Sequence, residues 1–254
     1  MIEELSDYLQ ECEIEVVAVE NVSLPATKEG KHSIFVLPGY NLVEMMEDTL
    51  DEEESPSEYV RHQLEEVHSL SVEDVWRQIV KSQLEYSDLS SEQKNLEGKD
   101  FEEIYHSYSL LWDGHDLLSE EQCETETEPF HVTVEWLEEN IEEDEELIVL
   151  ILPQESGYEA PLWIPMGGFN ECPFPVHQSV VIKHWQEEHG IKLLAVSDDI
   201  WVMQTGKPPQ TFEEALKLAK EHFIFCSYVL EGHDSLGDYA DYLMKHDVWY
   251  FWWD

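Results

Sequence analysis

The segment GGFNECP, residues 167–173, holds the side chains best suited to chemistry in this 254-residue chain. Gly167 and Gly168 permit positive φ angles and a close approach to the backbone. Asn170 offers an amide that both donates and accepts hydrogen bonds, and Cys172 offers a thiol that is a nucleophile when ionised. These four residues form a candidate binding site, with Cys172 as the candidate catalytic group. The alternative interpretation is a tight turn that depends on glycine and buries the thiol.

A nucleophilic cysteine needs a base beside it. His177, His184 and His189 follow the segment closely in the sequence, but sequence order does not bring any of them to Cys172 in space. The chain contains no phosphate-binding loop, Rossmann fingerprint, GxSxG elbow or HExxH motif. We therefore expect no cofactor, and the pattern leans away from an enzyme.

Two Gly-His-Asp triplets suggest a second kind of chemistry, metal binding. WDGHDLL contains His115 and Asp116, and LEGHDSL contains His233 and Asp234. Imidazole and carboxylate groups are common metal ligands. However, an aspartate in front of a helix is ordinarily an N-cap, and Asp234 fits that role. Metal binding is therefore the minor interpretation of these four residues.

The chain ends in the aromatic run VWYFWWD, residues 248–254. Each large apolar side chain contributes ~1.5–3 kcal/mol when it is fully buried. We therefore expect a final strand that lies in the sheet and is buried on both faces. In the alternative interpretation, Trp252 and Trp253 wall a ligand or partner groove, together with Trp185.

The elements that must position these residues follow from the apolar patterns of the C-terminal part. Extended segments are predicted at residues 147–153, 161–168, 191–197 and 200–206, the last two joined by a turn at Asp198-Asp199. Helices are predicted at residues 176–189, from Thr211 onward and at 236–244. Gly190 would end the first of these helices, and Thr211 with Glu214 would form a capping box for the second.

The pattern of the N-terminal part likewise predicts both strands and helices. Strands are expected at 13–19, 32–38 and, within an acidic region, at 130–137, where the residues alternate. Helices are expected at 2–11, after Gly39, and at 57–69, 71–86 and 99–112. We place a boundary near residue 145, between an acidic α+β region (1–145) and a compact α+β domain (146–254). The predicted fold class is α+β, with a mixed sheet flanked by amphipathic helices.

Charge is the strongest bulk property, with a formal net charge of −45. Residues 1–146 carry 42 acidic and 7 basic side chains, whereas residues 147–254 carry 16 and 6. So few lysines and arginines disfavour binding to nucleic acid or to an anionic membrane surface. The acidity has three explanations: solvation, life at high salt or high pH, and a basic protein partner that is attracted by the field.

Other features indicate a cytoplasmic protein. The apolar runs are much shorter than the ~20 residues of a membrane span. The N-terminus MIEELSDYLQ lacks the basic and apolar regions of a secretory signal. Four cysteines without a CxxC pair are expected to be buried thiols in a reducing compartment.

Four motifs resemble a bacterial family, the domain of unknown function numbered 4253. They are GGFNECP, KHWQEEHGIKLLAV, KPPQTFEEALKLAKEHFIFC and the terminal WYFWWD, which together cover about residues 147–254. The resemblance implies a small α+β domain and no established activity. The chain departs from the usual family pattern at Ser227-Tyr228, where an aspartate is common, and at Gly190-Ile191, where glycine-alanine is usual.

Two functional hypotheses follow. In the first, the chain is a non-catalytic interaction protein whose acidic region binds a basic partner, like an immunity protein or a DNA-mimicking inhibitor. In the second, it is an enzyme or small-ligand binder with a pocket at GGFNECP. A third reading is an acidic housekeeping protein without a defined partner.

Overall fold

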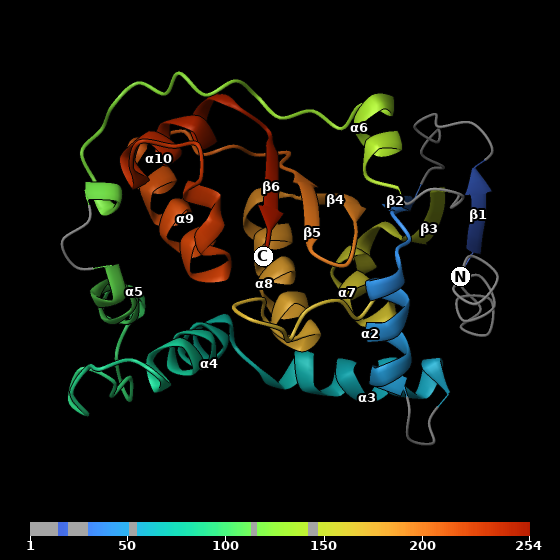
Figure 1. Ribbon diagram of the computed structural model, residues 1–254, viewed down its shortest axis with the longest axis horizontal. Helices are drawn as coiled ribbons and strands as arrows, with labels where there is room; N and C mark the ends of the chain where they lie inside the picture. The colour runs from blue at the N-terminus through green and yellow to red at the C-terminus, as the bar shows by residue number, and fades with distance from the viewer. Residues whose placement is uncertain (1–14, 20–29, 51–54, 113–115, 142–146) are drawn as a thin grey trace.

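The computed structural model describes residues 15–19, 30–50, 55–112, 116–141 and 147–254, and within them one six-stranded sheet crosses the molecule (Figure 1). The strands lie in the order β1-β3-β2-β4-β5-β6. Their bounds are Glu15–Val19, Leu147–Pro153, Lys31–Val36, Lys192–Val196, Ile200–Gln204 and Val248–Trp252, in that order. Strands β2 and β4 are parallel and the other neighbours are antiparallel. The sheet is therefore mixed, as the sequence predicts.

Helices account for most of the remaining described chain. The α-helices are α2 Tyr40–Leu50, α3 Pro56–Ser69, α4 Val72–Glu85, α5 Phe101–Ser109, α6 Val134–Glu139, α7 Ala160–Trp163, α8 Pro175–His189, α9 Phe212–Phe225 and α10 Leu236–Lys245. Short 3-10 turns are η1 Leu110–Trp112, η2 Asp116–Leu118, η3 Gln154–Glu159 and η4 Ser227–Leu230. Together with the mixed sheet, they confirm the α+β class. The helix expected at residues 2–11 lies outside the described residues.

Local signals place the helices that matter for the site. Helix α8 ends at Gly190, whose φ of 61° is the left-handed conformation that suits glycine. Helix α9 begins with the expected capping box, in which the Thr211 side chain accepts from the Glu214 backbone and the Glu214 side chain reaches back. The end of α8 and the start of α9 were therefore predictable from short-range chemistry.

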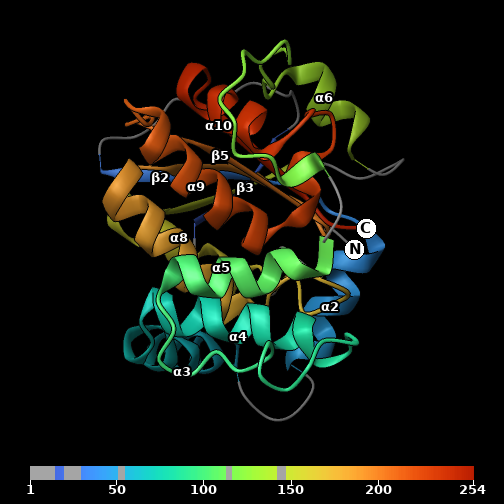
Figure 2. The same cartoon turned by 90° about the vertical axis from the view of Figure 1, so that its left-hand side faces the viewer.

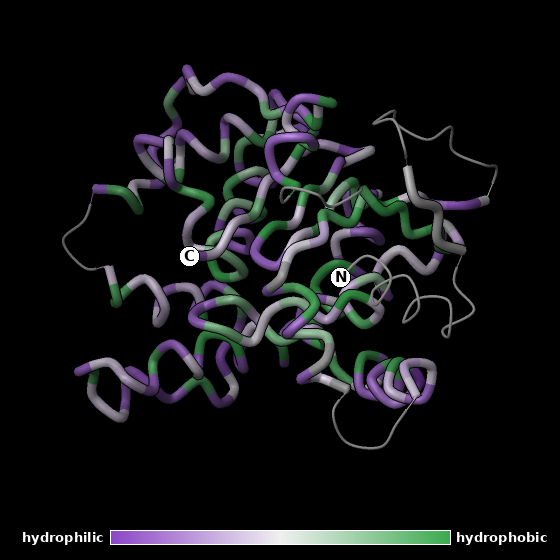
Figure 3. Tube along the Cα trace, turned by 45° about the vertical axis from the view of Figure 1, so that its right-hand side comes forward, coloured by the Kyte–Doolittle hydropathy of each residue, from purple (hydrophilic) through white to green (hydrophobic). Residues whose placement is uncertain are grey.

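The two faces of the sheet are covered differently. On β2 and β3, Ile34 and Leu150 belong to the main hydrophobic core, whereas their neighbours Phe35 and Val149 belong to a smaller one. This is the alternation expected of strands buried on both sides. Helices α2 to α5 and α7 to α10 contribute to the main core, and the segment around α6 covers the other face. Figure 3 shows the hydrophobic stretches gathered in the interior and the hydrophilic ones on the outer helices.

The sheet joins strands from both parts of the sequence. Strands β1 and β2 flank β3 on its two sides, although β3 follows residue 145. Helices α3 and α4 pack against α8 (Figure 2). The division at residue 145 remains a prediction from composition, and it passes through one continuous sheet.

The aromatic tail forms strand β6 and lies in the sheet, as predicted. It pairs with β5, with Trp201 opposite Phe251 and Met203 opposite Trp249. Trp249 and Phe251 are fully buried in the main core, whereas Tyr250 on the other face is half-buried. The strand is last in the order of the described sheet, which leaves its second face and outer edge less covered than we expected.

Two predicted extended segments are wrong. Residues 130–137 were expected as a strand, but residues 134–139 form α6, because the Thr133 side chain accepts from the Trp136 backbone N–H and starts a helical turn. Residues 161–168 begin inside helix α7, whose first turn tolerates Pro161 since no partner is needed for the missing N–H. In both cases a signal for a helix start, the Thr133 cap in α6 and Pro161 in the first turn of α7, outweighed the apolar pattern.

None of the helices in the described ranges has the length and the apolar character that would let it cross a membrane.

Candidate functional site

The segment GGFNECP is a tight loop built around a buried glutamine. Gly167 and Gly168 have φ values of 110° and 77°, and Asn170 has a φ of 44°. A side chain at Gly167 would collide with the amide of Gln178 and the carbonyl of Pro173. The Gln178 amide donates to the carbonyls of Met166 (2.9 Å) and Pro173 (2.7 Å), which fixes the shape of the loop.

The polar side chains of this loop bind other parts of the chain. The Asn170 amide donates to the backbone carbonyl of Asp254 at the C-terminus. The Glu171 carboxylate accepts from the Ser227 hydroxyl at 2.8 Å. The loop therefore connects the C-terminal tail to turn η4, and Ser227, one of the departures from the family pattern, is part of this connection.

Cys172 lies in the interior. Its side chain is 5% exposed, and burial raises the pKa of its thiol well above the ordinary value. The three histidines that follow it have other partners: His177 contacts Gln78 Oε1 at 2.8 Å, His184 contacts Glu221, and His189 contacts the Lys207 carbonyl. A neutral, enclosed thiol is a poor nucleophile.

The three predicted binding tryptophans take different positions. Trp185 and Trp253 are 0% and 1% exposed in the main core. Trp252 is half-buried and donates from its indole to Asp199 Oδ2 at 2.9 Å. It lines a cavity of about 380 Å3 together with Tyr250, Asp198 and Asp199. The structure thus places Trp252 at a cavity and Trp185 and Trp253 in the core.

The structure describes the second Gly-His-Asp triplet in full, but only Asp116 of the first. His115 lies outside the described residues, and Asp116 is exposed at the start of η2. His233 Nδ1 contacts Asp238 Oδ2 at 2.8 Å, not Asp234. The predicted N-cap role of Asp234 is wrong, because the Ser235 side chain, one residue closer to α10, accepts from the Asp238 backbone N–H. Among the described residues, no group of three or more His, Cys, Asp or Glu could hold a metal ion.

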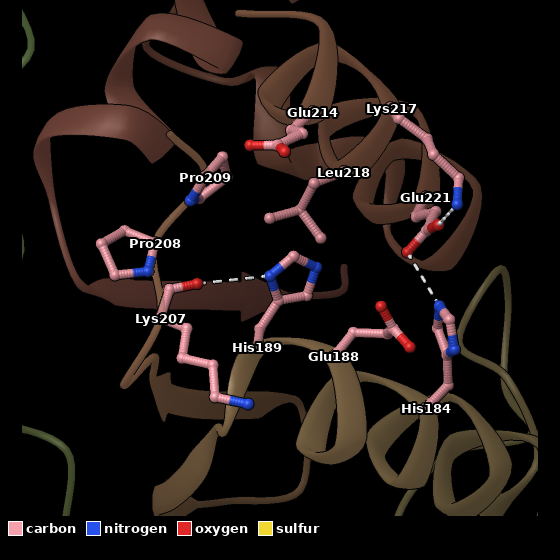
Figure 4. A pocket seen from close by; sticks show the side chains of 10 residues that line it. All are labelled: His184, Glu188, His189, Lys207, Pro208, Pro209, Glu214, Lys217, Leu218 and Glu221. Carbon is pink, nitrogen blue, oxygen red and sulfur yellow. Dashed lines mark hydrogen bonds and ion pairs between the residues drawn. The ribbon is translucent and has the colours of Figure 1, made fainter. Parts of the chain in front are cut away.

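A cavity of about 260 Å3 lies between helices α8 and α9 and the loop that precedes α9 (Figure 4). Its lining contains both signs of charge and two imidazoles. The lining residues are His184, Glu188, His189, Lys207, Pro208, Pro209, Glu214, Lys217, Leu218 and Glu221. All of them belong to the C-terminal part of the chain.

Glu221 is the buried centre of one side of this cavity, at 3% exposure. Its Oε2 accepts from the Trp185 indole at 2.8 Å and lies 3.5 Å from His184 Nε2, while its Oε1 lies 3.6 Å from Lys217 Nζ. Burial opposes ionisation of this carboxyl, but His184, Trp185 and Lys217 outweigh burial and lower its pKa. Burial likewise opposes a charged His184, but Glu221 outweighs it and raises the pKa of His184.

His189, on the last turn of α8, favours its neutral form. Burial lowers its pKa, although the hydrogen bond to the Lys207 carbonyl acts in the opposite direction. Because a carbonyl only accepts, Nδ1 carries the proton in this contact of 3.4 Å. The other ring nitrogen, Nε2, then carries a lone pair, and Figure 4 shows it directed toward the space between Leu218, Glu188 and Glu221.

Residues 116–139, here called the acidic segment, run along α10 toward the sheet (Figure 1). Their nine carboxylates are all exposed, and the segment has no lysine or arginine. They are Asp116, Glu120, Glu121, Glu124, Glu126, Glu128, Glu135, Glu138 and Glu139. A cavity of about 570 Å3 opens beside the segment, lined by Glu124, Glu126, Thr127, Gly232, Asp234 and Asp238.

Hydrogen bonds fix the acidic segment on the folded body. The Gly237 backbone donates to the Ser119 carbonyl at 2.9 Å, and the Thr125 backbone donates to Asp241 Oδ2 at 2.9 Å. The Phe130 backbone donates to the Tyr242 hydroxyl at 3.1 Å. A side chain at Gly237 would collide with the Glu121 carbonyl, so glycine permits this close approach.

Sequence reasoning missed the residues that organise both sites. Gln178 and Glu221 are polar residues in helices and carry no motif, so only their burial reveals their roles. The one available signal for Glu221 was its position at i+4 from Lys217 on α9, which is a common exposed ion-pair spacing.

Comparison with known proteins agrees with the resemblance seen in the sequence. No curated protein and no solved structure matches the chain. Residues 148–254 match a family described as a domain of unknown function. The matched stretch contains the GGFNECP loop, the cavity between α8 and α9 and the aromatic tail.

Proposed function

We propose that this chain is a non-catalytic interaction protein that binds a basic protein partner through the acidic segment, as an immunity protein or a DNA-mimicking inhibitor would. The observation that carries the proposal is the row of nine exposed carboxylates without a lysine or arginine among them. Within the described residues, ion pairs reach only two of the nine: Glu120 with Lys220 at 3.1 Å and Glu124 with Lys245 at 3.7 Å. The other charges are available to a partner.

The backbone of the segment supports this function because it is already ordered. Contacts to α10 hold it along much of its length. A partner therefore meets a preformed row of charges and does not have to offset the loss of chain entropy on binding. The net charge of −45 adds a long-range field that accelerates the approach of a basic protein.

Two cavities give the acidic segment places for basic side chains. The cavity at Glu124 and Glu126 is lined mostly by carboxylates, and a lysine or arginine side chain fits its chemistry. The cavity at Asn140, just past the segment, combines Asp198 and Asp199 with the rings of Tyr250 and Trp252. Carboxylates and aromatic faces both attract a guanidinium or ammonium group.

A charge-matched comparison tests the proposal. The variant Glu121→Gln, Glu126→Gln, Glu128→Gln removes three unpaired charges from the acidic segment. The control Glu73→Gln, Glu92→Gln, Glu97→Gln removes three exposed charges from α4 and the loop after it, so both proteins have the same net charge. Each is used as bait in cell lysate at ~50 mM and ~500 mM salt, where screening is weak and strong.

We expect wild type and control to retain a basic protein at low salt, and the segment variant to lose it. High salt should release it from both baits. Purified partner should then bind the segment variant at least about tenfold more weakly. The proposal is wrong if no basic protein is retained, or if all three baits retain it equally.

The alternative function, an enzyme or small-ligand binder at GGFNECP, has less support. The polar groups of this loop bind Asp254 and Ser227 of the same chain, and the Cys172 thiol is enclosed. These contacts favour the interpretation of a structural turn.

A further inference from the structure

The cavity between α8 and α9 differs in charge from the rest of the molecule. The chain has 58 acidic side chains and 13 basic ones, yet this cavity places two lysines and two histidines beside three glutamates. Balanced charges of both signs in one cavity suit a ligand that itself carries both signs. The acidic segment, by contrast, offers only negative charge.

Several lining groups already have partners and are not available to a ligand. Glu221 binds Trp185, His184 and Lys217. Glu214 accepts from the backbone N–H groups of Gln210 (2.9 Å) and Thr211 (3.1 Å), which belong to the start of α9. These contacts hold the Glu221 and Glu214 carboxylates in place in the wall of the cavity.

Three charged or accepting groups in the lining have neither an ion pair nor a side-chain hydrogen bond to another described residue. They are the Glu188 carboxylate, the Lys207 ammonium group and His189 Nε2. Glu188 and Lys207 are exposed, so a ligand can reach them from solvent. In the neutral His189 ring, Nε2 is an acceptor because Nδ1 donates to the Lys207 carbonyl. In Figure 4 His189 and Glu188 lie side by side at the centre, and the Lys207 side chain runs past His189 on the side away from Glu188.

We propose that this cavity binds a small zwitterion of amino-acid size. Its ammonium group is held by the Glu188 carboxylate and His189 Nε2, and its anionic group by the Lys207 ammonium. Leu218, Pro208 and Pro209 supply an apolar wall for the carbon skeleton between the two charges. The volume of about 260 Å3, that of roughly nine water molecules at ~30 Å3 each, accommodates a ligand of this size.

Calorimetric titration of the full chain tests the site with simple probes. Glycine, β-alanine and γ-aminobutyrate carry both charges at increasing separation, whereas acetate and methylammonium carry one charge each. We expect at least one zwitterion to bind at least about tenfold more tightly than either single-charge probe, because only a zwitterion can contact both the Glu188 carboxylate and the Lys207 ammonium group. The proposal is overturned if every zwitterion binds no more tightly than acetate and methylammonium.

Matched variants locate the binding. Glu188→Gln and Lys207→Gln each remove one charge from the cavity. Glu187→Gln, one residue away on α8, and Lys192→Gln on β4 remove the same charges from exposed positions that do not line it. We expect each cavity variant to weaken zwitterion binding about tenfold and each control to change it less than about twofold. Equal effects of cavity and control variants would also overturn the proposal. All four side chains are exposed, so melting curves should show that the variants fold.

Discussion

At the scale of single residues, buried polar groups decide how the C-terminal domain is assembled. Gln178 bonds both sides of the GGFNECP loop and also accepts from the Trp201 indole at 2.7 Å. Glu221 joins Trp185 and His184 of α8 to Lys217 of α9. If one partner of such a buried group is removed, the remaining polar group stays buried without a hydrogen bond. This destabilises the fold more than the loss of a hydrogen bond at the surface. Both groups therefore act as connections between elements.

The pair of His184 and Glu221 predicts a pH-dependent stability. The pKa of His184 is raised above 6.5, so its contribution is complete below pH 6.5 and is lost as pH rises through the folded value. The pKa of Glu221 is lowered below 4.5, so its contribution is present above pH 4.5 and is lost as pH falls through the folded value. The pair therefore stabilises the fold most between these two limits.

We expect His184→Gln to lower the free energy of unfolding by about 1–2 kcal/mol at about pH 5.5, and by clearly less at about pH 8.5. Urea denaturation at both pH values measures the difference. His106→Gln, an exposed histidine on α5, is the control and should show a small effect at both. An equal loss for His184→Gln at the two pH values would contradict the assigned charge pair.

At the scale of elements, strand β6 shows how a terminal segment can complete a core. Trp249, Phe251 and Trp253 are at most 1% exposed and pack against Trp185 and Phe225 of the helical layer. The ring centroids of Trp185 and Phe251 are 5.6 Å apart in a stacked arrangement. The aromatic composition predicted that the tail is buried, and pairing with β5 places it in the sheet. Helix α6 shows the opposite outcome, since alternation alone predicted the wrong element there.

Deleting residues 249–254 should abolish cooperative folding. Truncating one buried aromatic side chain costs about 3–5 kcal/mol, and whole domains are stable by only ~5–15 kcal/mol. We expect insoluble protein or a melting curve without a transition in circular dichroism. Tyr86→Ala, at a position that is 91% exposed, is the control and should melt like wild type. A soluble truncated chain with an unchanged melting temperature would contradict the role of β6.

At the scale of the whole molecule, the sheet connects the acidic and the family-like parts. Strand β3 opens the C-terminal part, but both its hydrogen-bonded neighbours, β1 and β2, come from the N-terminal part. Six of its seven residues are buried. The acidic segment also contacts the C-terminal part, along α10. The acidic segment therefore lies on a folded core to which both the N-terminal and the C-terminal parts of the chain contribute.

Residues 146–254 expressed alone should be unstable. Without β1 and β2, strand β3 would expose two unpaired edges and its apolar side chains, a combination that favours aggregation. We expect the fragment to be aggregated, or to bind a hydrophobic dye and melt without a clear transition. The full chain measured in parallel should melt cooperatively. A fragment that melts as sharply and at the same temperature as the full chain would show an independent domain.

The sequence by itself determined the features that depend on neighbours along the chain. Helix α9 with its capping box, the Gly190 end of α8, the strand character of 147–153 and 248–252, and the negative charge all follow from local chemistry and composition. Only the tertiary structure decided which distant residues meet: Glu221 with Trp185 and His184, His233 with Asp238, and β3 between β1 and β2. The reason is physical, because a cap or a turn is stabilised within a few residues, whereas a cavity or a strand order results from packing over the whole core. For the same reason the GGFNECP motif was visible in the sequence, but the partners that occupy its polar groups were not.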